Sequence, residues 1–347
     1  MIARDEAVFL PGCLESIRPA VDEIIVVDTG SSDETREIAR SWGAVVIDHR
    51  WNDDFAAARN VALDAALGEW LLYVDADERL VSSHQTRILD CFDATSALAA
   101  FVQFKPKSGY TRYREPRLFR NRPDLRFTGP IHETIVPALD VIMAQEPLGI
   151  VSSPIRLDHL GYDGDQSRKH SRNLPLLLQA VRDQPGRVYY WAHLAETFAA
   201  LGKGAAAIEA AKTGLVVGRR AETDKQKADT SLLFQFLARA ALDKNPLAAM
   251  VLIHEGLARY PSDYALTFLK GRGLCLTGSY EDALFIFRQL LEVEVDGLVD
   301  ELIAFDGRIF GEFSAHLAGV CLMKMGRQSE ATAMFRAAIG MSLRSVS

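Results

Sequence analysis

The sequence has few cysteines, and they are not grouped. Its 347 residues include only four, at widely separated positions: Cys13, Cys91, Cys275 and Cys321. No C-x-x-C pair or Cys/His cluster is present, which argues against a structural zinc site and against a disulfide framework. We therefore expect reduced, mostly structural thiols, as in a cytoplasmic protein.

The sequence also lacks a long apolar run and an excess of positive charge. No stretch of about 18 apolar residues could span a bilayer, and charged residues at positions 4–6 replace the apolar stretch of a signal peptide. The 39 Lys and Arg residues are outnumbered by 46 Asp and Glu residues, which gives a formal net charge of −7. A protein whose main partner is nucleic acid or an anionic membrane would carry a basic footprint. We expect neither partner and no transmembrane segment.

What is present is the composition of an ordinary globular protein, 48% hydrophobic and 24% charged. Residues 1–105 alternate between strand-like and helix-like segments, which predicts an α/β domain with a mostly parallel sheet. Strands are expected at 23–30 and 69–75, ending at Asp28 and Asp75. Helices are expected in two segments: one over 31–43 that starts with a capping box of Ser31 and Glu34, and one over 52–68 that starts at Asn52 or Asp53.

The pattern changes twice further along the chain. Segments such as "ALAAFVQFK" (97–105) and "YREPRLFRN" (113–121) look like strands that complete the first domain. After about residue 170 only helical patterns remain. Because the length exceeds the usual size of one hydrophobic core, we place an α/β domain at 1–165 and an all-α domain at 166–347.

The helical part contains an internal repeat of small residues. Ala249 and Ala283 lie 34 residues apart, and Ala283 and Ala331 are each followed four residues later by a phenylalanine. Gly271 and Gly319 precede these two alanines by 12 residues. The spacing resembles the tetratricopeptide repeat, a helix-turn-helix unit of 34 residues, while longer gaps elsewhere indicate insertions.

The acidic pair in "LLYVDADERL" (71–80) poses an electrostatic problem. Neighbouring carboxylates such as Asp75 and Asp77 repel each other unless a cation or hydrogen bonds compensate. Two interpretations remain open. In the first, the aspartates cap the residues that follow and stay solvated. In the second, they lie with Asp28 at one edge of the sheet, in a crevice that binds a nucleotide and its metal-bound phosphates. Mg²⁺ or Mn²⁺ would suit the second case, because both prefer oxygen ligands.

The stretch from "MIARDEAVFL" to "LLYVDADE" (1–78) resembles the nucleotide-sugar half of family 2 glycosyltransferases of the GT-A fold. The resemblance is strongest to the bacterial subgroup that carries tetratricopeptide repeats behind this domain, and weaker similarity continues to about residue 175. It implies a nucleoside diphosphate sugar as donor, with a UDP-sugar as the first candidate, and Mn²⁺ or Mg²⁺ as cofactor. The family pattern begins with a complete strand ahead of "MIARDE", so we expect either a start further upstream or a shortened strand that weakens nucleotide binding.

The resemblance also assigns roles to individual residues. It implies that Asp28, with Thr29 and Gly30, holds the nucleoside. Arg59 and Asn60 would lie near the nucleotide and its diphosphate; the alternative for Arg59 is a surface ion pair with Asp53 or Asp54.

The remaining roles concern the metal and the proton transfer. Asp77 would bind the metal, while Asp75 would lie towards the ribose and the metal waters. Glu133, in "TGPIHETI", is the candidate general base, with capping of a helix as the alternative. A further metal ligand would be His159 or, less favoured by chain order, His132; either one can instead be a structural histidine.

Together these features predict an inverting, metal-dependent glycosyltransferase of the hexosyltransferase type. The repeats would bind the acceptor, a polypeptide or a saccharide, or a protein partner. The competing hypothesis is an adaptor whose repeats bind protein and whose first domain is catalytically silent. Binding of a nucleotide sugar with Mn²⁺ distinguishes the two.

Overall fold

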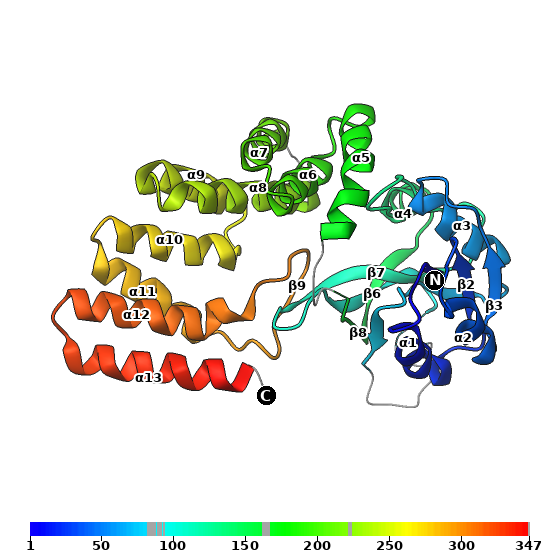
Figure 1. Cartoon of the computed structure of the whole chain (residues 1–347), viewed down its shortest axis with the longest axis horizontal. Coiled ribbons are helices and arrows are strands. Elements are labelled where there is room, and N and C mark those ends of the chain that lie inside the picture. Colours follow the sequence, from blue (N-terminus) through cyan, green and yellow to red (C-terminus); the bar gives the residue numbers. More distant parts are fainter. Residues whose placement is uncertain (82–87, 89–91, 93, 162–166, 221–223, 346–347) are drawn as a thin grey trace. The chain divides into compact units, whose positions relative to one another are not determined.

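The computed structural model describes residues 1–81, 88, 92, 94–161, 167–220 and 224–345 (Figure 1). The chain forms two compact units. The N-terminal unit comprises Met1–Ser108, Arg112–Gln166 and Val299–Glu301. The helical unit comprises Gly109–Thr111, Ser167–Leu298 and Leu302–Ser347. Two short segments, 109–111 and 299–301, therefore belong to a different unit from their sequence neighbours.

The N-terminal unit mixes helices and strands, as the sequence predicts. Its elements are, in chain order, β1 (Ile2–Ala3), α1 (Leu10–Ile17), β2 (Ile25–Asp28), α2 (Thr35–Ser41), β3 (Val45–Asp48), α3 (Phe55–Ala65), β4 (Trp70–Leu72), β5 (Glu78–Leu80), β6 (Ala97–Lys105), β7 (Arg112–Arg120), α4 (Val136–Met143), β8 (Gly149–His159) and β9 (Val299–Asp300). A 3-10 turn, Arg18–Ala20, follows α1.

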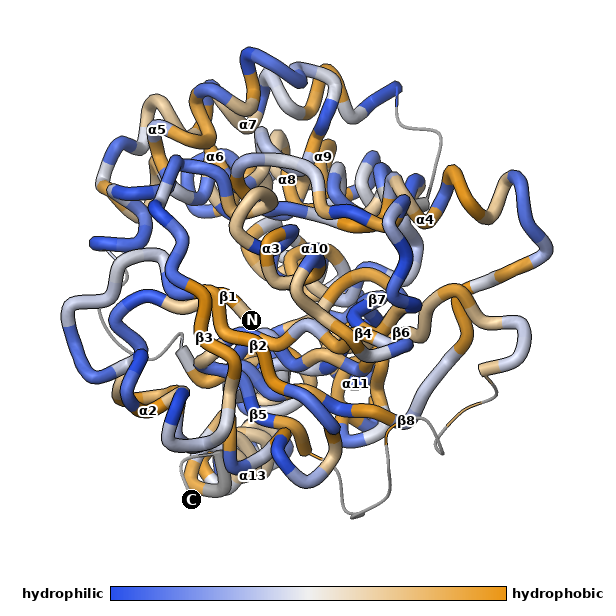
Figure 2. Tube along the Cα trace, turned by 90° about the vertical axis from the view of Figure 1, so that its right-hand side faces the viewer, coloured by the Kyte–Doolittle hydropathy of each residue, from blue (hydrophilic) through white to orange (hydrophobic). Residues whose placement is uncertain are grey.

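The strands form two sheets. The first has the order β1-β2-β3 and is parallel throughout. Its middle strand β2 is buried at every position, which explains its unbroken apolar run, coloured orange in Figure 2. The second has the order β4-β7-β6-β8-β5, in which β6 runs parallel to β8 and antiparallel to β7, and β9 pairs in parallel with β7.

The expectation that Asp28 and Asp75 share one sheet edge is wrong, because β2 and β4 belong to different sheets. The β1 strand has only two residues and pairs with β2, while β4 pairs with β7. Among the described residues, no backbone ladder joins the two sheets. In addition, β4 ends at Leu72, so Asp75 lies in the connection that follows the strand.

The predicted start of the first helix is also wrong. The α2 helix begins at Thr35, and no side-chain cap from Glu34 is formed. Ser31 does not cap it, because its backbone N–H and its hydroxyl both donate to the Asp28 carboxylate. Ser31 therefore belongs to the turn after β2, and the capping box does not form.

The second predicted helix likewise begins later than expected. The α3 helix starts at Phe55, and its N-cap is Asp54 rather than Asn52 or Asp53. The Asp54 carboxylate accepts a hydrogen bond from the Ala57 backbone N–H at 2.9 Å, which satisfies one of the unpaired donors of the first turn. This cap fixes the helix that carries Arg59.

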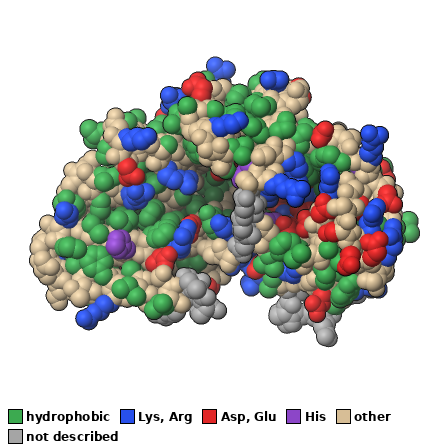
Figure 3. Space-filling model, viewed as in Figure 1, with side chains coloured by type: hydrophobic (Ala, Val, Ile, Leu, Met, Phe, Trp, Pro, Cys, Tyr) green, Lys and Arg blue, Asp and Glu red, His purple; other side chains and the backbone are tan. Residues whose placement is uncertain are grey.

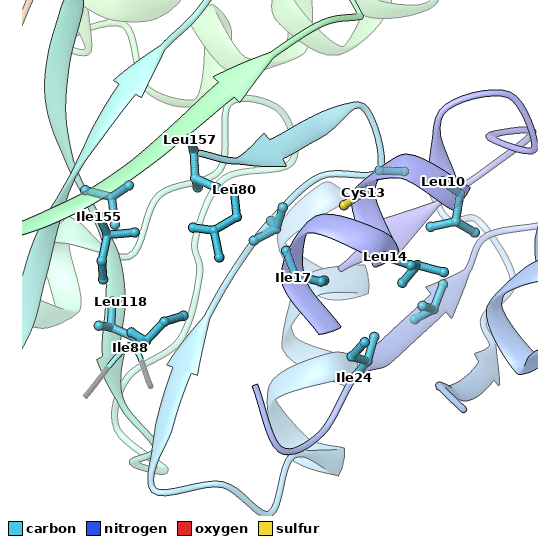
Figure 4. Packing of buried hydrophobic residues seen from close by; sticks show 14 of the residues in the cluster. Leu10, Cys13, Leu14, Ile17, Ile24, Leu80, Ile88, Leu118, Ile155 and Leu157 are labelled. Atoms are coloured by element: carbon cyan, nitrogen blue, oxygen red, sulfur yellow. The ribbon is translucent and has the colours of Figure 1, made fainter. Parts of the chain in front are cut away.

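The core next to the acidic pair lies between α1 and the second sheet (Figure 4). Leu10, Leu14 and Ile17 form one stripe of α1, as expected for helical spacing, and are buried. They belong to the same buried cluster as Leu80 of β5 and Leu157 of β8. This packing anchors the strand that immediately follows the acidic pair.

The helical unit is built from helices that pack against their neighbours in chain order, most of them joined by short connections. In chain order they are α5 (Ser167–Asp183), α6 (Val188–Ala200), α7 (Gly204–Gly218), α8 (Asp224–Leu242), α9 (Pro246–Arg259), α10 (Tyr264–Leu276), α11 (Tyr280–Leu291), α12 (Glu312–Lys324) and α13 (Gln328–Ser345). Within the described part of the chain, no helix is long and apolar enough to cross a membrane.

The repeat spacing in the sequence has a packing explanation. A Cβ atom on Gly271 of α10 would lie 2.8 Å from the ring of Phe287 on α11. A Cβ atom on Gly319 of α12 would lie 2.7 Å from the ring of Phe335 on α13. Each helix pair thus places a phenylalanine against a glycine of the preceding helix. The longer gap before Ala331 corresponds to the connection between α11 and α12, which contains β9.

Candidate active site

The acidic pair lies in a tight turn between β4 and β5. The Glu78 backbone N–H donates to the Asp75 carbonyl oxygen at 3.0 Å, and the Asp75 N–H donates to Glu78 Oε2 at 2.9 Å. The thiol of Cys13 also donates to the Asp75 carbonyl oxygen at 3.4 Å. The turn is therefore fixed through its backbone, and the side chains of Asp75 and Asp77 contact different partners.

The partner of Asp77 is His159. The antiparallel register of β5 and β8 places Glu78 opposite His159, and the Leu160 N–H donates to the Asp77 carbonyl oxygen at 2.9 Å. His159 Nε2 lies 3.1 Å from Asp77 Oδ2. The structure therefore brings together two of the predicted metal ligands.

The predicted ligand set remains incomplete. Within the described ranges, no three His, Cys, Asp or Glu side chains are arranged to hold a metal ion. His132, the other histidine considered, lies in the connection before α4 with a φ of 50° and does not complete such a group.

Arg59 of α3 joins two other predicted residues. Its NH2 atom lies 2.8 Å from Asp75 Oδ1, and its Nε atom donates to Glu133 Oε1 at 2.5 Å. The guanidinium is buried, and its NH1 atom has no hydrogen-bond partner among the residues that the structure describes. It lies over the ring of Tyr73, 5.0 Å from the centroid, and 5.6 Å from that of Phe127. Arg59 thus fixes the positions of both carboxylates.

The alternative pairing of Arg59 with an aspartate at the start of α3 does not occur. Asp54 caps the helix, and Asp53 accepts a hydrogen bond from Trp51 Nε1 at 2.9 Å. The buried position of Arg59 follows from its place on the helical face that includes Ala56 and Leu63.

Sequence reasoning missed a second buried ion pair behind the turn. Arg117 of β7 donates from NH1 to both carboxylate oxygens of Glu78 at 2.7 Å, and its Nε donates to Glu115 at 2.7 Å. Glu115 also accepts from the hydroxyl of Tyr73 at 3.2 Å. The available signals were the acid directly after the D-x-D pair and an arginine next to the apolar residues Leu118 and Phe119 of β7. Arg117 is therefore part of this buried cluster.

The cluster around the turn carries more negative than positive charge. Two guanidinium groups, those of Arg59 and Arg117, are paired with four carboxylates: Asp75, Glu78, Glu115 and Glu133. Asp77 adds a fifth beside His159. In Figure 3, acidic and basic side chains gather over the N-terminal unit, in the right-hand part of the view.

The pKa values of two of these carboxyls reflect their surroundings. Burial opposes ionisation of Asp75, but the charges of Arg59 and Arg117 outweigh it and hold the pKa of Asp75 below its usual range. Burial raises the pKa of Glu78 to about 7, although Arg117 acts in the opposite direction. A buried cluster with surplus negative charge favours a bound proton or a cation.

The predicted nucleoside-binding residues lie in the turn after β2. Asp28 Oδ1 accepts from the N–H groups of Gly30 and Ser31 at 3.0 and 2.9 Å. The Thr29 hydroxyl donates to the Ala3 carbonyl oxygen at 3.2 Å. Gly30 has a φ of 107°, a conformation that glycine adopts without strain. Asp28 is buried and shapes its own loop, so the structure gives it a definite structural role.

Asn60 has a structural role in positioning Glu133. Its amide oxygen accepts from the Phe127 N–H at 2.9 Å, and its amide nitrogen donates to the Phe127 carbonyl oxygen at 3.0 Å. The segment continues into a paired bridge between Thr128 and Thr134, with N–H to oxygen distances of 3.0 Å. Asn60 and this bridge hold the loop that carries Glu133 against α3.

A cavity of 330 Å³ lies next to this cluster in the N-terminal unit. Its walls come from β4, from α3 and from the segment 20–25, and they are mainly apolar. Arg59 is the one predicted site residue that lines it, so the cavity lies on the β4 side of the guanidinium rather than at Asp77.

Comparisons with known proteins identify a related family and related sequences. Residues 1–141 match the sequence model described as Glycosyl transferase family 2. A TPR repeat-containing protein of Synechococcus elongatus is 40% identical over 227 residues, covering 63% of this chain and 56% of the relative. The SPbeta prophage-derived glycosyltransferase SunS of Bacillus subtilis is 26% identical over 196 residues, covering 53% of this chain and 45% of the relative. The chain thus spans about half the length of these curated relatives.

Among solved structures, the crystal structure of MamA is similar to the helical part. It has 15% sequence identity and a TM-score of 0.39, and it covers 53% of this chain and 96% of MamA. The N-terminal unit is a glycosyltransferase family 2 domain, and a tetratricopeptide-like helical region follows it. The prediction of an α/β domain with this family identity and of an all-α repeat region is confirmed.

Proposed function

We propose that the protein transfers a sugar, with inversion, from a nucleoside diphosphate sugar to an acceptor nucleophile. A UDP-sugar is the first donor to test, and transfer of a hexose is the first reaction. The observation that carries the proposal is the surplus of carboxylates around the D-x-D turn, because a divalent cation would offset it and could in turn bind a diphosphate. The family 2 match over residues 1–141 supports the same chemistry.

The residues at the turn fit a divalent metal ion. Asp77 Oδ2 and His159 Nε2 lie 3.1 Å apart and offer one oxygen and one nitrogen. Mg²⁺ in phosphate-binding sites commonly takes one or two protein ligands and completes its shell with water and phosphate oxygens. Mn²⁺ accepts carboxylate and imidazole ligands. When bound, such an ion supplies electrostatic stabilisation of the leaving diphosphate.

The residues of the protein have separate roles in this proposal. Arg59 fixes the Asp75 carboxylate, and Asp75 would accept from ribose hydroxyls or metal waters. Glu133 is fixed through Oε1 by the same guanidinium. A carboxylate accepts hydrogen bonds at both oxygens, so Glu133 can take the proton of the acceptor nucleophile at Oε2. Asp28 and its turn form the wall against which the nucleoside binds.

The helical unit is the proposed site for the acceptor, a polypeptide or a saccharide, or for a protein partner. Deleting it is a poor test, because β9 of the N-terminal unit follows α11 in sequence. Such a deletion would remove the strand that pairs with β7. It would also remove Glu301, whose Oε1 atom lies 2.7 Å from NH1 of Arg114. Point substitutions on the exposed faces of α5–α13 should therefore replace truncation.

A panel of nucleotide sugars tested by thermal shift, with and without Mn²⁺, tests the donor class. A ligand that binds the folded state raises the melting temperature in proportion to ln(1 + [L]/Kd). We expect a rise with at least one UDP-sugar that needs Mn²⁺ and that is lost in Asp77→Asn. If no nucleotide sugar changes the melting temperature, the adaptor hypothesis replaces the transferase proposal.

A further inference from the structure

Two cysteines that are far apart in sequence lie side by side in the helical unit. The Sγ atoms of Cys275 on α10 and Cys321 on α12 are 2.9 Å apart, close enough for one thiol to donate a hydrogen bond to the other. Cys321 is fully buried in the cluster that also contains Phe287, whereas Cys275 is partly exposed near the end of α10. The connection between α10 and α12 includes the whole of α11.

The two thiols are chemically different. The hydrogen bond with Cys321, aided by the charge of Arg272, lowers the pKa of Cys275 despite its partial burial. The same hydrogen bond, together with burial, raises the pKa of Cys321. The thiolate is the reactive form of cysteine, and Cys275 is the more accessible of the two thiols.

Cys13 is an isolated buried thiol in the same protein and serves as a comparison. Its thiol donates to the Asp75 carbonyl oxygen at 3.4 Å, and burial raises its pKa to about 12. A thiol in this environment is inert. Cys275 is more exposed than Cys13, and its pKa is lowered rather than raised. We therefore expect oxidation to select Cys275 over Cys13.

We propose that Cys275 and Cys321 form a redox site in which a peroxide creates a disulfide between α10 and α12. The Cys275 thiolate attacks one oxygen of hydrogen peroxide, which breaks the O–O bond, gives a sulfenic acid and releases hydroxide. The Cys321 sulfur then attacks the Cys275 sulfur, the S–O bond breaks, and water leaves. In total two thiols and one peroxide give one disulfide and two waters, and a dithiol reductant reverses the reaction.

The geometry needs little adjustment for this bond. A disulfide has an S–S length of about 2.05 Å, so the two sulfur atoms must approach by roughly 0.9 Å. The closed loop spans 46 residues and encloses α11. Because a cross-link over a loop of this length restricts the unfolded chain, it should raise the melting temperature of the helical unit by about 5–10 °C. Oxidation would thus stiffen the part of the solenoid that contains α10, α11 and α12, independently of any transferase activity.

The test treats the full-length protein with a small molar excess of hydrogen peroxide under denaturant-free conditions. Free thiols should fall from the four of the sequence to two, and peptide mapping without reductant should find Cys275 linked to Cys321. Melting temperature should rise, and dithiothreitol should reverse both changes. Cys91→Ala serves as the matched control, because it removes another thiol and should leave this cross-link intact.

Two variants keep the proposal falsifiable. Cys275→Ser and Cys321→Ser, each checked for native circular dichroism, should lose the cross-link and the rise in melting temperature. If Cys321→Ser does not fold, Cys275→Ser alone decides, since position 275 is partly exposed. The proposal is overturned if Cys275 is oxidised to sulfinic acid without cross-linking, if Cys321 pairs with a different cysteine, or if neither thiol is consumed.

Discussion

A methyl group on Gly161 would collide with the carboxylate of Asp77. Gly161 follows β8, whose last residue His159 contacts the same carboxylate, and the intervening Leu160 donates to the Asp77 backbone. The end of β8 therefore encloses Asp77 and leaves room only for glycine. This enclosure fixes the orientation of the proposed metal ligand.

We accordingly expect Gly161→Ala to reduce Mn²⁺ affinity by about 10-fold or more, the usual effect of disturbing the surroundings of a metal ligand. Titration of the full-length protein with Mn²⁺, followed by calorimetry, measures it. Gly149→Ala is the matched control, because a Cβ atom at that position meets nothing within 4 Å. Equal affinities of the two variants would contradict the role given to this enclosure.

Removing the Arg59 guanidinium should destabilise the N-terminal unit strongly. Arg59→Met leaves Asp75 and the nearly buried Glu133 without their cation, and breaking a buried pair in this way costs about 3–5 kcal/mol in the free energy of unfolding. Urea denaturation provides the measurement. Arg327→Met removes an exposed pair with Glu330, which solvent screens, so its cost should be much smaller than that of Arg59→Met. If the two substitutions lower the free energy of unfolding by similar amounts, the bridging role of Arg59 is refuted.

The Glu78–Arg117 pair should behave as one unit. Arg117→Met alone leaves the fully buried Glu78 unpaired, so it should lower the free energy of unfolding by about 3 kcal/mol or more. Adding Glu78→Gln removes the stranded charge, and the double variant should recover at least about 1 kcal/mol of this loss. If the losses of the two single variants simply add, the two side chains are not coupled as the structure indicates.

Asp263, the N-cap of α10, gives a prediction for pH dependence away from the candidate site. It accepts from the Leu266 N–H at 2.9 Å and from the side chain of Gln235 at 2.7 Å, but burial outweighs these bonds and raises its pKa. The native state therefore holds this proton more tightly than the unfolded state does. The contribution of Asp263 to the free energy of unfolding should thus fall as the pH rises from its ordinary pKa of 3.8 through the raised value.

Asp263→Asn tests this sign. The amide can still cap Leu266 but does not ionise, so the stability of the variant relative to the wild type should increase as the pH rises from 3.8 through the raised pKa of Asp263. Asp263→Ala is the control: it loses the cap and should be less stable by about 1–2 kcal/mol. A wild type that gains stability over the variant in this pH range would contradict the raised pKa.

Local features of the sequence predicted much of the fold. The apolar run of β2 and the strand-like segments at 97–105 and 113–121 located strands, and the glycine-to-alanine spacing located helix pairs that pack a phenylalanine against Gly271 and Gly319. Helix starts were less predictable. Ser31 has the side chain of a cap, yet the neighbouring Asp28 binds it more closely than the helix does.

The candidate site depended on contacts that sequence spacing does not reveal. Asp77 and His159 are 82 positions apart in sequence and meet only through the register of β5 and β8. Arg59 and Glu133 meet because Asn60 ties the segment at Phe127 to α3. The pairing of Glu78 with Arg117 was overlooked because sequence spacing does not show which buried charges meet.

Calorimetric titration of UDP into the full-length protein with Mn²⁺ is the most direct test of the central claim, that a divalent cation offsets the surplus negative charge at the D-x-D turn and in turn binds a diphosphate. The account predicts binding that requires Mn²⁺, is lost in Asp77→Asn, and persists in Asp124→Asn, an exposed acid paired with Arg122. Binding of UDP that is equally strong without Mn²⁺ or in Asp77→Asn, or no binding in any condition, would contradict it.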